Sequence, residues 1–291
     1  MKPVISHSET DAFLTCEYRH YYAHVDSLEK IEKGSALTRG IIGHAAFEAF
    51  FKARQNNMPW MNAVNMVTQV LTEHMMKTTD PKTIELLGQL AILVPGFLEH
   101  FKSRIESWKV VAVEEEFRIK FEDFDFALKP DYFVREKNGE YALFDSKFTY
   151  DFYSPQLVQI LPQLPKYAGA LKILGNPVDK AYYSFIRYRN LRDMSPGNIY
   201  QMTSINLNDT RVRSAVMEQI VTARRILELK QLGPEEHKKR IVHTSTKVNC
   251  QWCPFLDLCV AEVSGSDGKH IKRSLYQPNT YGYEPGVMLD V

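Results

Sequence analysis

The chain has 291 residues, of which 44% are hydrophobic and 24% are charged, so it can form one large or two small domains with substantial cores. Its 36 basic and 35 acidic residues nearly balance, which excludes a strong overall field that would attract nucleic acid. No stretch approaches the roughly 20 apolar residues of a membrane span, and residues 1–10 are too polar for a signal peptide. We therefore expect a cytoplasmic protein without a membrane partner, in which disulfides are unfavourable.

Helical patterns fill the first third of the chain. A short helix is expected after Ser8 or Thr10, either of which could cap it, and a longer one over residues 40–54. Residues 59–108 are again helical in pattern. Strand-like alternation then begins and continues over residues 110–148.

Helices and strands alternate in the second half of the chain. We expect a helix interrupted by two prolines, two strands and a long helix, at residues 156–174, 181–189, 202–206 and 209–232. This order predicts an α/β fold with a mixed central sheet, helices on its faces and helical additions at both ends. We expect a single domain over residues 1–263 and a loosely ordered tail over residues 264–291. Within the domain we expect a helical insertion, a sheet core and a C-terminal cysteine-bearing segment, at about residues 56–108, 110–206 and 209–263.

Acidic and basic side chains gather at the ends of two predicted strands. Asp131 follows Pro130, and Asp145 and Lys147 lie two residues apart, so their side chains point to the same face of a strand. Carboxylates can hold a divalent cation that polarises a phosphodiester and generates hydroxide near neutral pH, and a lysine can hold the attacking water. An ion pair at a strand end would explain the same residues without catalysis.

The two aspartates can share one cation only if they lie on one face of the predicted hairpin. A strict two-residue turn would place Asp131 and Asp145 on opposite faces. A three-residue loop over residues 137–139, with Gly139 left-handed, would place them directly opposite each other. A bulge near Pro130 would shift the register equally. We therefore predict an odd-length connection or a bulge.

Further candidate ligands precede these strands. His44 follows Gly43 on a predicted helix, where the glycine leaves room for a close approach, although a single histidine on an apolar helix is commonly a packed core residue. The run of acidic residues 114–116 has the pattern of a solvated edge, although Glu116 could supply a further carboxylate.

Three of the four cysteines lie within ten residues of one another. Cys250, Cys253 and Cys259 form a C-x2-C-x5-C pattern, and Cys16 is the only other cysteine. This arrangement indicates a site for soft metals, because scattered cysteines rarely give it. Four thiolates can hold zinc or an iron–sulfur cluster, and the spacing alone does not choose between them; four free cysteines are the metal-free alternative. A bound cluster would tie the N-terminal helix to the C-terminal segment.

Two segments could contact nucleic acid. The strip 182–192 interleaves aromatic and basic residues, which suits base stacking and phosphate contacts, although a plain strand with a solvated face would have the same pattern. The basic run 237–240 is better explained as a solvated loop than as a DNA clamp.

Taken together, these motifs resemble the RecB-like branch of the PD-(D/E)xK nuclease family. Pro130-Asp131 followed by Asp145-Ser146-Lys147 resembles the family signature, and Arg39-Gly40-Ile41-Ile42-Gly43-His44 resembles the branch's helix with a metal-binding histidine. Gln163-Leu164-Pro165-Lys166-Tyr167 resembles its Gln-x-x-x-Tyr motif. The cysteines resemble those of the AddB-type nucleases and the CRISPR-associated RecB-like exonucleases. The motifs run from Cys16 to Cys259, most of the chain.

The resemblance implies a restriction-endonuclease-like fold and a set of site residues. The implied metal ligands for Mg²⁺ or Mn²⁺ are Asp131, Asp145 and His44, with Lys147 as the catalytic lysine. Gln163 and Tyr167 are expected beside the active site or the DNA strand, although Pro162 and Pro165 depart from the fuller pattern because they would delay or kink the helix. The resemblance also implies a 4Fe–4S cluster, with Zn²⁺ as the alternative, on Cys16, Cys250, Cys253 and Cys259.

We therefore predict a metal-dependent DNA exonuclease that acts on single-stranded or free DNA ends, in recombination, repair, phage DNA processing or CRISPR adaptation. The chain has no Walker A motif, so a helicase motor would have to come from a partner helicase or recombination protein. Two alternatives stay open. One is a catalytically inactive DNA-binding or scaffold module with a structural metal cluster, and the other is a zinc-bound regulatory protein.

Overall fold

The structure is a computed structural model that describes residues 2–189, 193 and 195–279, and its residues fall into two compact units. The first unit comprises Met1–Lys33, Arg118–Leu128 and Val216–Val291, and the second comprises Gly34–Phe117 and Lys129–Ala215. None of the helices in the described ranges combines the length and the apolar character needed to cross a membrane.

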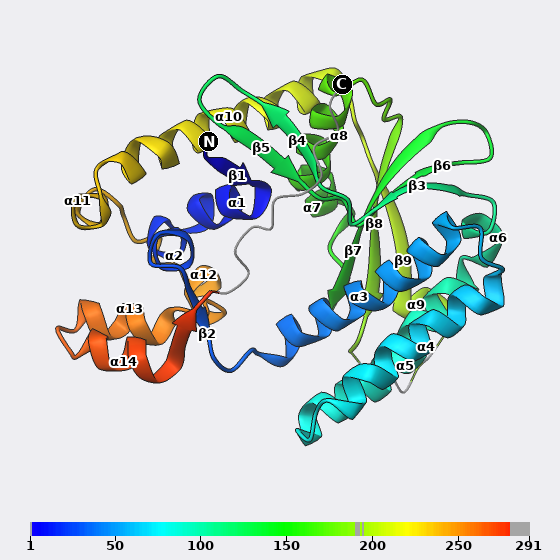
Figure 1. The fold of residues 1–291 in the computed structure, drawn as a ribbon, viewed down its shortest axis with the longest axis horizontal. Coiled ribbons are helices and arrows are strands. Elements are labelled where there is room, and N and C mark those ends of the chain that lie inside the picture. The colour runs from blue at the N-terminus through cyan, green and yellow to red at the C-terminus, as the bar shows by residue number, and fades with distance from the viewer. Residues whose placement is uncertain (1, 190–192, 194, 280–291) are drawn as a thin grey trace. The chain divides into compact units, whose positions relative to one another are not determined.

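The second unit is built on a five-stranded mixed sheet (Figure 1). Only the β7–β8 pair is parallel, and the other neighbouring strands are antiparallel. The order across the sheet is β3 (Lys109–Val113), β6 (Tyr132–Arg135), β7 (Tyr141–Thr149), β8 (Lys180–Arg187) and β9 (Tyr200–Ile205). The predicted α/β class with a mixed central sheet is confirmed.

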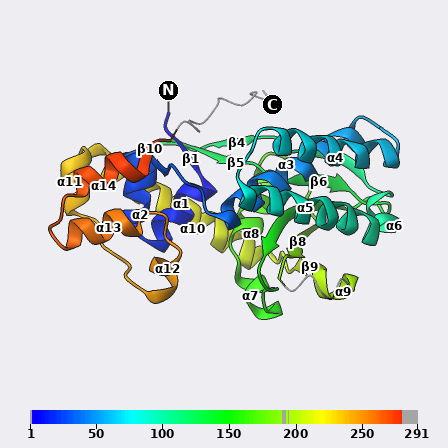
Figure 2. The ribbon, with the colours of Figure 1, turned by 90° about the horizontal axis from the view of Figure 1, so that it is seen from below.

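Helices lie on both faces of this sheet. Three long helices pack together on one face, where they lie side by side in Figures 1 and 2, and share a core with Phe144 and Tyr182 of the sheet. They are α3 (Ser35–Gln55), α4 (Trp60–Met76) and α5 (Pro81–His100), followed by the short α6 (Lys102–Ile105). Helix α8 contacts β7 and β8. The remaining helices of this unit are α7 (Pro155–Ile160), α8 (Gln163–Ile173) and α9 (Pro196–Ile199), and α10 (Asp209–Gln231) runs on into the first unit.

Prolines stand at the starts of two of these helices: Pro81 is the first residue of α5, and Pro162 directly precedes α8. Asp80 caps α5 by accepting a hydrogen bond from the Thr83 backbone N–H at 3.0 Å. The helix expected over residues 156–174 is two helices, because α7 ends at Ile160 and α8 begins at Gln163. Pro165 lies in the first turn of α8, where its missing N–H costs nothing.

The β6–β7 hairpin has the predicted odd-length loop. Tyr132 pairs with Phe144 and Arg135 with Tyr141. The Glu136 N–H donates to the Glu140 carbonyl at 2.8 Å, which leaves residues 137–139 as the loop. Gly139 has a φ of +90°, a conformation that favours glycine. The register prediction is therefore confirmed.

The first unit has two small sheets surrounded by helices. One sheet has the order β1 (Val4–Ser6), β5 (Asp125–Leu128), β4 (Phe117–Lys120), with β1 and β5 parallel, and the other pairs β2 (Leu28–Lys30) with β10 (Tyr276–Pro278). Besides α10, its helical elements are α1 (His7–Thr15), α2 (Glu17–His20), the π-helical turn η1 (Tyr21–Val25), α11 (Pro234–Lys239), α12 (Lys247–Gln251), α13 (Leu256–Val263) and α14 (Gly268–Leu275).

Two details of this unit differ from the sequence-based expectations. Ser6 caps α1, in place of Ser8 or Thr10, because the strand β1 ends there and the Ser6 hydroxyl accepts the Glu9 N–H at 3.2 Å. Part of the expected loose tail is ordered, since Asp267 caps α14 and β10 pairs with β2. The rest of that tail, residues 280–291, lies outside the described residues.

Candidate active site

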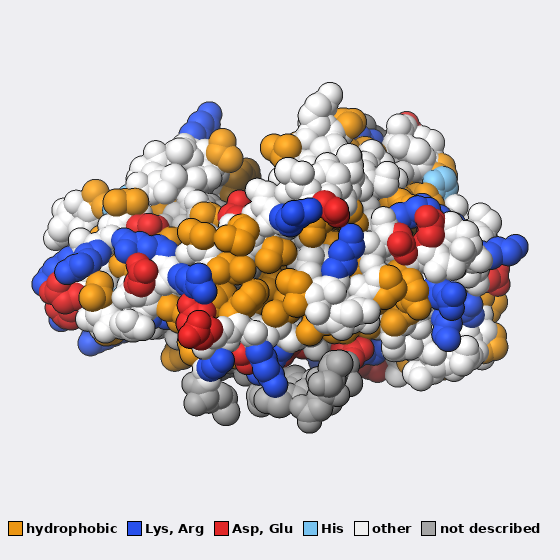
Figure 3. Space-filling view, turned by 90° about the horizontal axis from the view of Figure 1, so that it is seen from above, with side chains coloured by type: hydrophobic (Ala, Val, Ile, Leu, Met, Phe, Trp, Pro, Cys, Tyr) orange, Lys and Arg blue, Asp and Glu red, His pale blue; other side chains and the backbone are white. Residues whose placement is uncertain are grey.

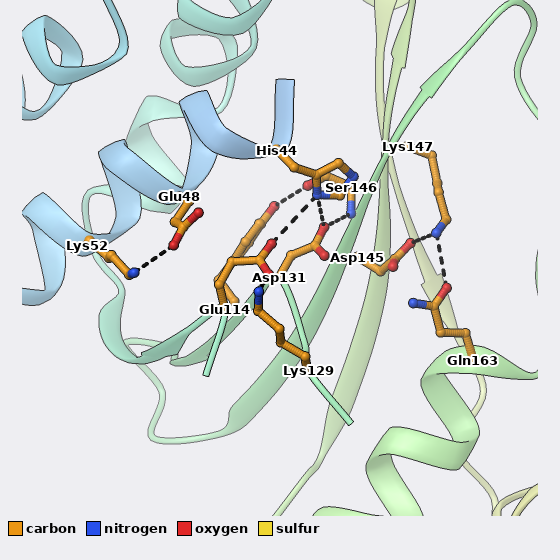
Figure 4. Close-up of polar contacts among 11 residues, drawn as sticks. His44, Glu48, Lys52, Glu114, Lys129, Asp131, Asp145, Ser146, Lys147 and Gln163 are labelled. Atoms are coloured by element: carbon orange, nitrogen blue, oxygen red, sulfur yellow. Dashed lines mark hydrogen bonds and ion pairs between the residues drawn. The ribbon is translucent and has the colours of Figure 1, made fainter. Parts of the chain in front are cut away.

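The candidate site lies where β7 continues beyond the start of β6. Strand β6 pairs with β7 only as far as Phe144, so the following backbone groups of β7 have no β6 partner. The carboxylate of Asp131, which immediately precedes β6, takes that place by accepting the Ser146 backbone N–H at 2.6 Å (Figure 4). Asp131 is thereby held beside Asp145, as the register predicts.

Three potential metal ligands converge from three elements. The Nδ1 atom of His44, on α3, lies 3.3 Å from Asp131 Oδ2 and 3.9 Å from Glu114 Oε1. In the described part of the chain, these three residues are the one set of three or more histidine, cysteine or acidic side chains whose ligand atoms all lie within 4.8 Å of one another. Carboxylate oxygens suit Mg²⁺ and Mn²⁺, whereas an imidazole nitrogen is a ligand that transition metals prefer.

The additional carboxylate beside His44 and Asp131 belongs to Glu114, whereas the sequence had suggested Glu116 for this role. Glu114 follows β3 with a φ of +50°, and its N–H donates to the Asp131 carbonyl at 3.1 Å. The β3–β6 register shifts between Val110 and Ala112, and such a shift changes which of the following carboxylates points into the site. A left-handed conformation at a non-glycine residue is costly and is typical of functional sites. The run of three glutamates gave no signal for choosing among them.

Glycine at position 43 allows α3 to approach β7 closely enough to deliver His44. A Cβ atom at Gly43 would lie 2.3 Å from the Phe148 ring, which is far inside van der Waals contact. The His44 and Phe148 ring centroids are 6.2 Å apart. The close approach expected from the sequence is therefore present.

Asp145 and Lys147 form an ion pair on β7. Lys147 Nζ lies 2.7 Å from Asp145 Oδ2 and donates a hydrogen bond to Gln163 Oε1 at 3.0 Å. Figure 4 shows Lys147 and Gln163 pointing toward each other from β7 and α8. Asp145 is buried at 2% exposure, whereas the Lys147 side chain is 31% exposed and accessible to a substrate.

Tyr167 lies one helical turn after Gln163 on α8. It is buried, and burial followed by the nearby Asp145 carboxylate raises the pKa of its hydroxyl. Both residues of the Gln-x-x-x-Tyr motif are therefore close to the Asp145–Lys147 pair.

The pKa directions show that carboxylates crowd this site. Burial and then the Asp131 charge raise the pKa of Glu114, and burial, together with Asp131, raises that of Asp145. Burial also disfavours ionised Asp131, but His44, Lys147 and the Ser146 N–H together outweigh it and lower the Asp131 pKa. The same carboxylates outweigh burial at His44 and raise its pKa to about 9. A divalent cation would relieve this repulsion, so the donor set fits one.

All four cysteines line one pocket of the first unit. Cys16 joins α1 to α2, Cys250 lies on α12, Cys253 follows it and Cys259 lies on α13. Burial and then the neighbouring cysteines, Cys16 first, raise the pKa of the Cys259 thiol. No three of the sulfur atoms lie within 4.8 Å of one another. Four thiolates that line one pocket with this wide spacing between their sulfur atoms fit a metal-containing group larger than a single ion.

The strip 182–192 and the basic run 237–240, which was expected to be a solvated loop, both differ from expectation. Tyr183 and Phe185 are fully buried, because β8 is an inner strand covered on both faces, so this part of the strip 182–192 is core. Beyond β8, Tyr188 is partly buried and Arg189 is exposed, and residues 190–192 lie outside the described residues. In the run 237–240, His237 is buried and Lys238 pairs with Glu262 at 2.6 Å.

Comparison with known proteins identifies the family. The chain matches the model of the PD-(D/E)XK nuclease superfamily over residues 4–260, and it belongs to that superfamily of metal-dependent nucleases. No curated protein matches the chain. Among solved structures, one titled "Crystal structure of SSO0001" is 15% identical, with 75% of this chain and 84% of that chain covered and a TM-score of 0.35. The assignment rests on the family match.

Proposed function

We propose that the chain is a Mg²⁺- or Mn²⁺-dependent deoxyribonuclease that degrades single-stranded DNA or DNA with free ends as an exonuclease. The observation that carries the proposal is the convergence of His44, Glu114, Asp131 and Asp145 beside an accessible lysine where β6 and β7 separate. These four residues would hold the metal. When bound, the cation would supply positive charge that polarises the scissile phosphate and favours ionisation of water near neutral pH.

The residues around the cation have separate tasks in this proposal. Lys147 lies where its ammonium group can hold the attacking water and offset the negative charge that develops on the phosphate. Gln163 accepts a hydrogen bond from Lys147 and so fixes the direction of the ammonium group. Tyr167, buried beside Asp145, keeps water away from the inner side of the site.

A nuclease assay tests this function directly. DNA labelled at the 5′ or the 3′ end, single-stranded or duplex, is incubated with the protein and Mn²⁺ or Mg²⁺, and a chelator is added to a parallel reaction. We expect progressive shortening from an end that stops with the chelator. Circular single-stranded DNA is the control, since an exonuclease cannot attack it. Absence of any metal-dependent cleavage on all four substrates would contradict the proposal.

We also propose that Cys16, Cys250, Cys253 and Cys259 hold a 4Fe–4S cluster with a structural role. Four thiolates around one zinc ion with Zn–S bonds of about 2.3 Å would lie only about 3.8 Å apart. The cysteines line one pocket, yet no three of their sulfurs lie within 4.8 Å of one another, which favours a larger group. Iron and sulfide analysis after anaerobic purification tests the proposal, and zinc without iron would contradict it. A helicase or recombination protein is the partner class that this nuclease would serve.

A further inference from the structure

Aromatic and arginine side chains gather where β7 and β8 end. These strands are parallel, so their carboxyl ends meet at one edge of the sheet, the edge where open α/β sheets commonly bind ligands. The Tyr188 N–H donates to the Thr149 carbonyl at 3.0 Å, which continues the pairing past β8 and brings Tyr188 next to Tyr150. The two rings meet edge to face, with centroids 6.0 Å apart.

Guanidinium groups stack on both of these rings. Arg39, on α3, lies with its Cζ atom 3.8 Å from the Tyr188 ring centroid, and Arg189 lies 4.8 Å from that of Tyr150. Arg39 is buried and is fixed by a 3.0 Å hydrogen bond to Gln89. Tyr150 remains 57% exposed and the Arg189 side chain 50% exposed. An exposed tyrosine ring with arginines beside it can stack against the face of another planar group, such as a nucleic-acid base.

This set of residues adjoins the candidate active site. Tyr150 lies three residues after Lys147 on the same chain segment, a distance of about 10 Å at the rise of an extended strand. At about 3.4 Å per nucleotide along a stacked strand, that separation is about three nucleotides.

The charges of this surface favour stacking over simple attraction of phosphates. Asp151 pairs with Arg189 at 2.6 Å and lies 3.8 Å from Arg187, so it offsets part of the arginines' charge. On the face of the whole molecule that Figure 3 shows, basic and acidic side chains are also interspersed, and neither sign of charge dominates. The exposed Tyr150 ring and the Arg189 guanidinium group are therefore the main features offered to a ligand, and Tyr188 and Arg39 support them from beneath.

We propose that Tyr150, Tyr188, Arg39 and Arg189 form a platform on which unpaired bases of a DNA strand stack beside the cleavage site. The inference rests on the proposed nuclease function and deepens it, because it names the residues that select single strands. A base within a duplex has both faces covered by its neighbours, so only an unpaired base can lie on the exposed ring of Tyr150. The platform also positions the DNA strand near the end of β7, the strand that carries Lys147.

Binding without cleavage tests the platform. Fluorescence anisotropy is measured in EDTA with a fluorescein-labelled oligothymidylate of about 20 nucleotides and with a duplex of the same length. Tyr150→Leu is expected to weaken single-strand binding about fivefold or more, the loss of one stacked base, and to leave duplex binding unchanged. Tyr150→Phe, which keeps the ring, should bind within twofold of the parent. Arg189→Ala should also weaken single-strand binding.

Arg213 supplies the matched control for Arg189. It is an exposed arginine of the same unit that pairs with Asp209 at 3.9 Å, and Arg213→Ala should leave single-strand binding unchanged. The salt dependence of binding should be the same for Tyr150→Leu and the parent, because no phosphate contact is removed. Single-strand affinity of Tyr150→Leu within twofold of the parent, or an equal loss for duplex, would overturn the platform. A protein that binds through Tyr150 but never cleaves would overturn only the nuclease function.

Discussion

The backbone N–H of Ser146 donates a hydrogen bond to the carboxylate of Asp131 at 2.6 Å, so the strand that carries Asp145 also holds the aspartate of the neighbouring strand. The Ser146 N–H is free for this bond because β6 begins only at Tyr132, the residue after Asp131, and pairs with β7 no further than Phe144. Because the donor is the backbone N–H of Ser146, a substitution of the Ser146 side chain does not remove it. The two carboxylates are therefore held together by the fold before any cation binds, although burial and the Asp131 charge oppose the ionisation of Asp145.

Glu114 is predicted to be a metal ligand, and its two neighbours are not. Glu114→Gln should weaken Mn²⁺ binding at least about tenfold and reduce cleavage, because a charged oxygen donor is lost. Glu115→Gln and Glu116→Gln are the matched controls within the same acidic run and should retain both properties. Titration of Mn²⁺ by calorimetry checks the three variants. Equal effects at all three positions would indicate a general charge effect and would contradict the assignment.

Gly43 is predicted to be required for the position of His44. Gly43→Ala places a methyl group against the Phe148 ring, so we expect a loss of about 1–3 kcal/mol in the free energy of unfolding and a loss of cleavage. Gly40 lies on the same helix and a Cβ there would meet nothing within 4 Å. Gly40→Ala should therefore stabilise the protein by about 0.4–1 kcal/mol and leave cleavage unchanged. Urea unfolding measures both, and similar behaviour of the two variants would refute the explanation.

The hairpin and the glycine could be anticipated from the sequence, while other features could not. Strand parity alone required an odd-length loop before Asp145, and a glycine before His44 indicated close packing. Glu114 could not be selected, because a register irregularity in β3 decides which glutamate turns inward. The strip 182–192 was misjudged in its first half, since alternation of residues does not reveal that β8 has neighbours on both sides and helices on both faces.

Loss of one cysteine is predicted to affect the whole protein. Cys16→Ser should lose bound iron and lower the melting temperature, because metal-binding energy is folding energy in such sites and Cys16 is the ligand most distant along the chain. Thr244→Ala is the control: only the Thr244 backbone N–H contacts Cys16 Sγ, at 3.5 Å, and this group is retained. Iron content and thermal unfolding are measured together. A fully stable Cys16→Ser protein would rule out the structural role.

Stability is predicted to fall in mild acid because of a partly buried histidine, His24. Burial lowers the pKa of His24 to about 4, although the nearby Glu9 charge opposes this shift and His20 and Lys230 support it. Since the pKa in the folded state lies below the ordinary value of 6.5, neutral His24 contributes fully above pH 6.5. This contribution, at most about 3 kcal/mol, is lost as the pH falls from 6.5 toward 4.

His24→Phe keeps a ring of similar shape without the proton. The free energy of unfolding of this variant should depend less on pH between 6.5 and 4 than that of the parent, at equal iron content. His270→Phe, at an exposed position of the same unit, should retain the parent's pH dependence. Denaturant unfolding across this range checks the slopes, and identical slopes for parent and His24→Phe would refute the prediction.

The central claim is that Asp145 serves a bound cation and not the stability of the fold, and one variant tests it. Asp145→Asn removes a buried charge whose pKa is raised by burial, so its melting temperature in EDTA should equal or exceed that of the parent. Its Mn²⁺-dependent cleavage of end-labelled single-stranded DNA should fall by about 100-fold or more, because a ligand of the cation is lost. Cleavage at the parent's rate, in a variant that melts at a lower temperature, would show that Asp145 is only part of a structural ion pair and would contradict the account.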